Sequence, residues 1–238
     1  MAVVATICFM VMIIASGFGV CTIPKTTQIL ASYTDANATS PFTTDQLVRA
    51  AVAGERYSFI DNDYDALMDV IRAINVEAET KYAGASINEL ATKAEDIYTL
   101  TPDALRHLDD CFAIANVARA FIIVFAVVGV VLSVLLLVKR ADGRRSLSHA
   151  LHWSAILLGV GLVALAVWAY LDFNTFFTAF HGVLFPQGNW TFSATSLLIT
   201  MYPETFWMGM GIIWVATSLV CGIIFFALGS AIKPRKAA

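Results

Sequence analysis

Residues 113–138 read AIANVARAFIIVFAVVGVVLSVLLLV, an apolar run whose only charged member is Arg119. An α-helix rises about 1.5 Å per residue, so about 20 apolar residues cross a hydrocarbon core of about 30 Å. The run is long enough to do so. Over the 238 residues of the chain, 58% are hydrophobic and only 14% are charged, whereas charged residues make up about 25% of soluble domains. The sequence therefore indicates a membrane protein.

Three further stretches, 1–21, 153–171 and 206–232, are uncharged and of similar length. The first has a second interpretation as a cleaved signal peptide. No basic residue precedes it, however, and the residues before Cys21 make a poor cleavage site, so a retained helix is favoured. We expect an all-α membrane protein with four transmembrane helices.

Basic residues predict the orientation of these helices. They gather in 139–152, expected to be a cytoplasmic loop, and in the tail 233–238, whereas 172–205 contains none. Basic residues beside spans mark the cytoplasmic side of a membrane. Both termini are therefore predicted to be cytoplasmic, and the segments 22–112 and 172–205 to share the outer face of the cell membrane.

The segment 22–112 holds 15 of the 18 carboxylates. It is predicted to form short helices broken by turns, which makes a mostly helical extracytoplasmic domain between the first two spans. Helix starts are expected at Thr44, Asp61 or Asp63, Ser86 and Thr101. Pro102 follows Thr101 at the first helical position, and a helix beginning there can run directly into the second span. A solvated surface accounts for most of the carboxylates.

Other classes of function lack support. The net charge is only −3 and no long basic run occurs, so nucleic acid is not an expected partner. The four cysteines show no CxxC pairing, and we expect neither a metal site nor a cofactor. Cys21 and Cys111 would both lie near the outer face, so a disulfide between them stays an alternative. No feature predicts the oligomeric state.

His107 is the first residue suited to proton transfer. Asp103, Asp110 and Cys111 stand at i−4, i+3 and i+4 from it, on one side of a helix. A carboxylate there can fix the tautomer of an imidazole and raise its basicity. An ordinary surface histidine with acidic neighbours explains the same spacing, and nothing supports Cys111 as a nucleophile.

His181 is the second candidate. The stretch 172–207 contains ten aromatic residues and no lysine or arginine. Aromatic belts at a membrane interface account for many of these rings, but not for a histidine among them. An ionisable side chain at membrane depth is a functional candidate.

The remaining polar residues near the spans have ambiguous roles. Arg119 either reaches toward lipid headgroups or holds a substrate oxygen. His149 and His152 would lie at the cytoplasmic start of the third span, where headgroup contact explains them better than a metal site without further ligands.

Two blocks of sequence resemble one bacterial family. The first runs from His107 to Asp110, and the second comprises His181, Phe185, Asn189-Trp190, Leu198-Ile199 and Tyr202-Pro203-Glu204. They are similar to the lipoprotein intramolecular transacylase (Lit) family of four-span membrane proteins, and the topology agrees over the whole chain. The chain departs from the family at Cys111-Phe112, where the family tends to have Val-Lys, and at Ser196, where it has Asp.

The resemblance implies a diacylglyceryl-modified lipoprotein as substrate, presented in the phospholipid bilayer. Its amino-terminal cysteine would receive the acyl chain from the sn-2 position of its own lipid, giving the lyso form. Such a transfer needs no nucleophile from the enzyme, because proximity already favours it. The resemblance makes His107 and His181 the acid–base pair, in either order. Asp110 and Asn189 would support them, and Arg119 or Trp190 would donate a hydrogen bond to the oxyanion.

Two other functions fit the same residues. One is a membrane scaffold whose acidic outer domain binds a partner, with both histidines structural. The other is a lipid-ester hydrolase at the outer leaflet, which would release a fatty acid instead of forming an N-acylated cysteine.

Overall fold

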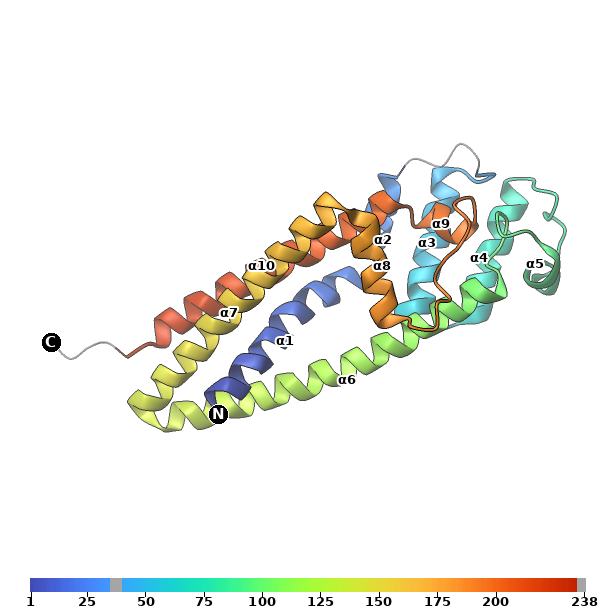
Figure 1. Ribbon diagram of the computed structural model, residues 1–238. Coiled ribbons are helices and arrows are strands. Elements are labelled where there is room, and N and C mark those ends of the chain that lie inside the picture. The colour runs from blue at the N-terminus through green and yellow to red at the C-terminus, as the bar shows by residue number, and fades with distance from the viewer. Residues whose placement is uncertain (35–39, 235–238) are drawn as a thin grey trace. The chain divides into compact units, whose positions relative to one another are not determined.

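The computed structural model describes residues 1–34 and 40–234, and every regular element in these ranges is an α-helix (Figure 1). Residues 235–238, the end of the predicted basic tail, lie outside the described residues. The chain divides into two compact units. We call the first, made of 1–21, 117–174 and the part from Gly211 onward, the span unit, and the second, made of 22–116 and 175–210, the connector unit.

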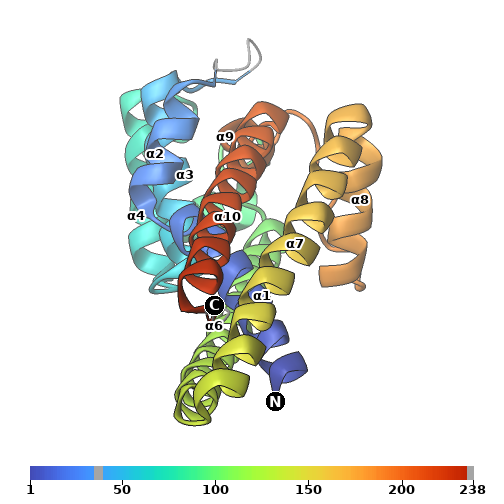
Figure 2. The same ribbon diagram turned by 90° about the vertical axis from the view of Figure 1, so that its left-hand side faces the viewer.

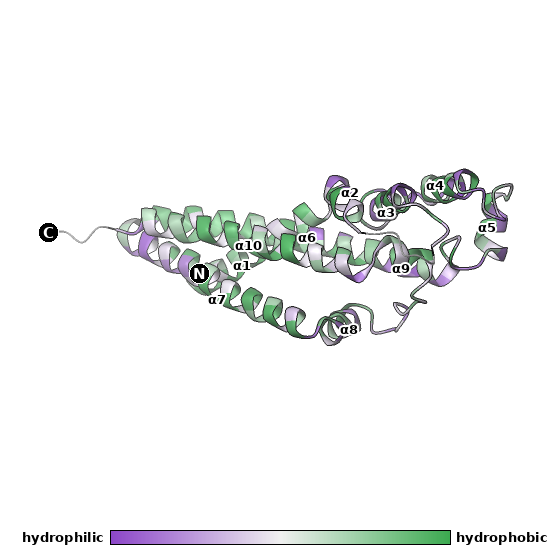
Figure 3. Cartoon of the chain, turned by 90° about the horizontal axis from the view of Figure 1, so that it is seen from above, coloured by the Kyte–Doolittle hydropathy of each residue, from purple (hydrophilic) through white to green (hydrophobic). Residues whose placement is uncertain are grey.

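Four helices are long and apolar enough to cross a membrane, and they match the four predicted spans. Their bounds are α1 Ala2–Cys21, α6 Pro102–Val138, α7 Arg140–Leu171 and α10 Glu204–Ile232. Apolar residues cover most of the length of these helices, while hydrophilic residues occur in the first part of α6 and at the start of α7 (Figure 3). As predicted, α6 begins directly after Thr101, whose side-chain oxygen accepts a hydrogen bond of 3.2 Å from the Ala104 amide.

The segment 139–152, predicted to be a loop, is helical from Arg140 onward. It contains no proline and is rich in arginine, alanine and leucine, which favour helix. Only Lys139 separates α6 from α7. A Cβ atom on Gly143 would stand 1.8 Å from the Leu136 carbonyl oxygen, so this tight connection requires glycine.

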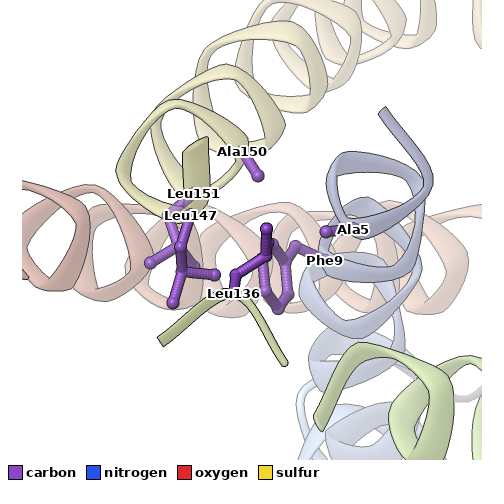
Figure 4. Packing of buried hydrophobic residues seen from close by; sticks show 6 residues of the cluster. All are labelled: Ala5, Phe9, Leu136, Leu147, Ala150 and Leu151. Carbon is purple, nitrogen blue, oxygen red and sulfur yellow. The ribbon is translucent and has the colours of Figure 1, made fainter. Parts of the chain in front are cut away.

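Within the span unit, α1 packs along α7. A cluster of buried side chains joins these helices to the end of α6 (Figure 4); it consists of Ala5, Phe9, Leu136, Leu147, Ala150 and Leu151. Farther along α1, the Ile14 carbonyl accepts a hydrogen bond of 3.0 Å from the Trp214 indole of α10. Small residues, such as Ala5 and Ala150 in the cluster, let helices approach closely in a membrane.

Six shorter helices belong mainly to the connector unit. They are α2 Pro24–Ser32, α3 Thr44–Phe59, α4 Tyr64–Glu77, α5 Ile87–Lys93, α8 Phe173–Leu184 and α9 Leu197–Met201. Their starts follow the predicted caps closely. Thr43 caps α3, one residue before the predicted start, while Asp63 caps α4 and Ser86 caps α5. Figures 1 and 2 show α2, α3 and α4 side by side.

The two chain segments of the connector unit are joined through buried contacts. The Asp96 carbonyl accepts a hydrogen bond of 2.7 Å from the Leu197 amide at the start of α9. The hydroxyl of buried Tyr202 donates a hydrogen bond of 2.5 Å to the Ala51 carbonyl in α3. A Cβ atom on Gly54 would stand 2.9 Å from this hydroxyl, so glycine gives the ring its room.

All four cysteines are free. The alternative of a disulfide between Cys21 and Cys111 is therefore not realised in this structure.

Candidate active site

His107 lies in the second turn of α6 and is only 8% exposed. Its ring centroid is 4.6 Å from that of Phe185 and 5.8 Å from that of Phe192. On the other edge, Nε2 is 3.8 Å from the sulfur of Cys111, one turn later. Nδ1 is buried and has no hydrogen-bond partner among the described residues. The side chain therefore keeps one ring nitrogen uncommitted in an apolar surrounding.

His181 lies in α8 and is 7% exposed. Its Nδ1 is 2.9 Å from the Phe177 carbonyl oxygen. A carbonyl can only accept, so Nδ1 carries the proton and Nε2 of the neutral ring carries a lone pair. The rings of Phe177 and Trp190 lie 3.8 and 5.1 Å from the imidazole, centroid to centroid. His181 is thus held in one tautomer, with Nε2 as the basic atom.

The two imidazoles lie together inside the connector unit. Their ring centroids are 6.1 Å apart and their planes differ by 28°, which is a stacked arrangement. Phe185 touches both of them, at 4.6 Å from His107 and 5.6 Å from His181. The two histidines that the sequence put forward as an acid–base pair therefore lie side by side, although they belong to two segments that are far apart along the chain; their catalytic role stays a prediction.

Burial affects the charge of His181. Desolvation lowers the pKa of its imidazole, and the hydrogen bond to the Phe177 carbonyl opposes this only in part. Removal of water penalises the charged ring more than the neutral one. The neutral, proton-accepting form is therefore favoured near neutral pH.

Asp110 makes no hydrogen bond to His107 in this structure, although their spacing suggested one. Its Oδ2 accepts hydrogen bonds of 2.8 Å from the Gln187 amide and 2.7 Å from the Asn189 amide. The i+3 spacing places Asp110 on the same side of α6 as His107. Its carboxylate, however, accepts its hydrogen bonds from two side-chain amides of the segment 175–210. Asp103, the other acid on this side, pairs with Arg106. Asp110 therefore joins the two segments instead of orienting His107 by a hydrogen bond.

A turn after α8 brings the two amides to Asp110. The Gly188 amide donates a hydrogen bond of 3.0 Å to the Phe185 carbonyl, and Gly188 has a φ angle of +78°. Residues with a Cβ atom rarely adopt this conformation. The turn was not recognised from the sequence, although Pro186 and Gly188 are typical turn residues.

The neighbouring carboxylate, Asp109, has a structural role. It accepts a hydrogen bond of 2.5 Å from the Tyr57 hydroxyl and one of 3.2 Å from the Asn62 amide. Burial, together with this carboxylate, raises the pKa of Tyr57, so the hydroxyl keeps its proton. Asp109 thus ties the start of α6 to α3, a contact that helical spacing could not predict.

Two predicted supporting residues have different positions. Trp190 packs its ring against His181, whereas Arg119 belongs to the span unit and is not among the side chains that surround the two imidazoles within the connector unit. For both residues the role at the oxyanion stays a prediction. No group of three or more metal-binding side chains occurs in the described ranges.

The chain has four apolar helices and a buried pair of histidines. It is therefore a helical multi-pass membrane protein whose candidate site lies among the segments that connect its spans. Among known proteins, the sequence model of the lipoprotein intramolecular transacylase Lit matches residues 3–207. The chain therefore belongs to this family, and it is an enzyme, a membrane-integral transacylase of lipoproteins. No curated protein matches it by sequence.

Solved structures agree in fold. The membrane-integral lipoprotein intramolecular transacylase of Bacillus cereus matches with a TM-score of 0.70 at 17% identity, over 97% of this chain and 93% of the other. A variant of that protein with one histidine replaced by arginine matches with a TM-score of 0.60 at 18% identity, over 97% and 88% of the chains. These likenesses concern the fold alone.

Proposed function

We propose that the protein moves an acyl chain from the sn-2 ester of a diacylglyceryl-modified lipoprotein to the amine of its own amino-terminal cysteine. His107 and His181 act as the acid–base pair, at the outer face of a membrane in which both termini are cytoplasmic. The observation that carries this proposal is the stacking of two buried imidazoles, 6.1 Å between centroids, among aromatic side chains.

The reaction needs little beyond proton transfer and charge stabilisation. The amine attacks the ester carbonyl, loses a proton, and passes through a tetrahedral oxyanion; the glycerol oxygen then leaves and gains a proton. Because amine and ester belong to one molecule, the enzyme mainly has to hold them in reacting geometry. The proton lost by the amine equals the proton gained by the glycerol oxygen, so the site returns to its starting state.

We assign the proton-accepting role to Nε2 of His181, because Nδ1 is occupied by the Phe177 carbonyl. His107 then supports the oxyanion or the leaving oxygen. When the Cys111 thiol donates its hydrogen to Nε2 of His107, Nε2 is the acceptor and the proton of the neutral ring is on Nδ1. Nδ1 is also the atom of His107 that has no hydrogen-bond partner among the described residues. A neutral imidazole in a dry site can donate such a hydrogen bond.

The direct test uses a synthetic diacylglyceryl lipopeptide with fatty acids of different length at sn-1 and sn-2. Intramolecular transfer leaves the total mass unchanged, so tandem mass spectrometry must locate the acyl group. We expect the amino-terminal fragment to gain the sn-2 acyl group. Hydrolysis would instead release the sn-2 fatty acid and lower the mass of the lipopeptide, and this outcome would replace our proposal by the hydrolase.

The orientation has its own test. A reporter that is active only in the cytoplasm, fused after residue 238, should be active, and the same reporter inserted between α4 and α5 should be inactive. The opposite pattern would put the histidine pair on the cytoplasmic side.

A further inference from the structure

Asn189 presents a buried acceptor that its neighbours leave unused. Its side-chain nitrogen donates a hydrogen bond of 2.7 Å to Asp110, while its Oδ1 is shielded from water and receives no hydrogen bond from any described residue. A buried carbonyl oxygen without a donor destabilises a folded protein. Such an atom is a candidate for contact with a ligand.

The partner of the Asn189 side chain determines which way its amide group is turned. A carboxylate only accepts hydrogen bonds, so the NH2 group of Asn189 must face Asp110 and Oδ1 must face away from it. Gln187 donates to the same carboxylate oxygen, at 2.8 Å, and holds it in place. A hydrogen bond from the NH2 group to a charged acceptor also polarises the amide, which makes Oδ1 a stronger acceptor.

Both sides of Asn189 adjoin the histidine pair. Asp110 stands three residues after His107, on the same side of α6. Trp190, the next residue in the chain, lies 5.1 Å from His181, centroid to centroid. Asn189 is therefore held between a residue one turn from His107 and a residue in contact with His181, and under the proposed function the reacting groups of the substrate must be placed near these two imidazoles.

The substrate offers one obvious donor. During transfer the ester supplies only acceptors, whereas the attacking amine carries N–H groups. One of its hydrogens goes to the base, and another remains free to donate. We propose that Oδ1 of Asn189 accepts this hydrogen bond and orients the amine for attack, and that Asp110 is the positioning residue that keeps the Asn189 amide in this direction. The inference rests on the function proposed above.

The test compares two lipopeptides that differ only in the α-amino group, which one of them lacks. Both carry an ether in place of the sn-2 ester, so neither reacts. Binding is measured with the purified protein in lipid nanodiscs at about pH 9, where an amino terminus with a pKa of about 7.7–8.0 is largely uncharged. The wild-type protein should bind the amine-bearing lipopeptide about tenfold more tightly, as one hydrogen bond predicts.

Three variants locate the origin of this preference. Asn189→Ala should bind both lipopeptides alike, with the affinity for the lipopeptide without the amine unchanged. Asp110→Asn should also lose the preference, because a neutral amide no longer dictates which way Asn189 turns. Gln187→Ala is the matched control, since it removes the other partner of Asp110 and leaves the acceptor intact; it should keep the preference.

Two results would overturn the inference: a wild-type protein that binds both lipopeptides equally, or an Asn189→Ala variant that retains the tenfold preference. Because neither lipopeptide reacts, the outcome does not depend on turnover. If the preference depends on Asn189 but the ester substrate is never N-acylated, the role of Asn189 as hydrogen-bond acceptor for the amine is retained and the proposed acyl transfer is rejected.

Discussion

The chain contains two pairs of histidines, and only one of them brings two buried imidazoles together. In the connector unit, His107 and His181 come from different helices, are buried, and stack at 6.1 Å between centroids. In the span unit, His149 and His152 stand three residues apart on α7; His149 is exposed and His152 is half-buried. Convergence of separate segments, not the presence of histidine, distinguishes the two pairs.

One member of the second pair, His152, packs between helices α7 and α10. Nε2 of His152 lies 3.0 Å from the Ser230 hydroxyl of α10, and its ring is 4.4 Å from that of Phe226. A Cβ atom on Gly229 would stand 2.9 Å from the imidazole, so the two helices are closely fitted there. A side-chain hydrogen bond between spans is worth about 0.6 kcal/mol on average. These contacts of His152 stabilise α7 against α10.

The largest expected effect separates the two pairs by activity. His107→Ala and His181→Ala should each lower the rate of acyl transfer by about 10²–10⁴-fold, the usual contribution of a positioned acid or base. His149→Ala and His152→Ala should stay close to the wild type. Rates are measured by tandem mass spectrometry of the lipopeptide. Equal losses in both pairs would remove the distinction that we draw.

The second prediction concerns pH. His181 acts as a base only when neutral, and its pKa is lowered by burial. As the pH falls, kcat/KM should first decline at about pH 7.7–8.0, where the amine of the free substrate becomes charged and can no longer attack. A second acidic limb, due to protonation of His181, should appear only below about 6.5, the ordinary pKa of histidine. A second acidic limb centred above about 6.5 would contradict a buried neutral base.

A third prediction sharpens the second. Trp190→Leu removes a ring that lies 5.1 Å from His181, centroid to centroid, and admits water to the imidazole. The limb due to His181 should then move upward, toward the ordinary histidine value, because less desolvation opposes the charged form, while the limb due to the substrate amine stays in place. Phe226→Leu, the matching change beside His152, should leave the pH profile where it is.

The smallest effect is expected from Ser230→Ala in the span unit. It removes the partner of His152 and should lower the free energy of unfolding by about 1 kcal/mol or less. Thermal unfolding in one detergent measures this change. A loss of transfer activity in Ser230→Ala would show that the second pair is functional.

Tyr202→Phe, which removes the buried hydrogen bond to Ala51 in the connector unit, should lower the free energy of unfolding by about 1 kcal/mol, measured by the same method.

The sequence was informative about the spans because hydrophobicity and length alone determine them. Capping residues such as Asp63 and Ser86 also predicted helix starts, since a cap acts within one turn. Most of the segment 139–152, expected as a cytoplasmic loop, is helical, because basic residues indicate the side of the membrane but do not prevent a helix.

The site was predictable only in its histidines. Spacing along α6 put Asp110 beside His107, but the partners of Asp110 come from a turn that begins 75 residues later, at Phe185. No periodicity within one helix can foresee such a contact. The turn itself depends on the left-handed conformation of Gly188. The sequence indicates such a turn only as a preference of proline and glycine for turn positions.

The central claim is that His107 and His181 act as one catalytic unit. The most direct measurement compares acyl transfer by His107→Ala, His181→Ala and the double variant under the same conditions. Residues that act together lose most of their effect with the first replacement. We therefore predict that the double variant is about as active as the weaker single variant. A double variant whose loss equals the product of the two single losses would show that the histidines act independently, and would contradict the account.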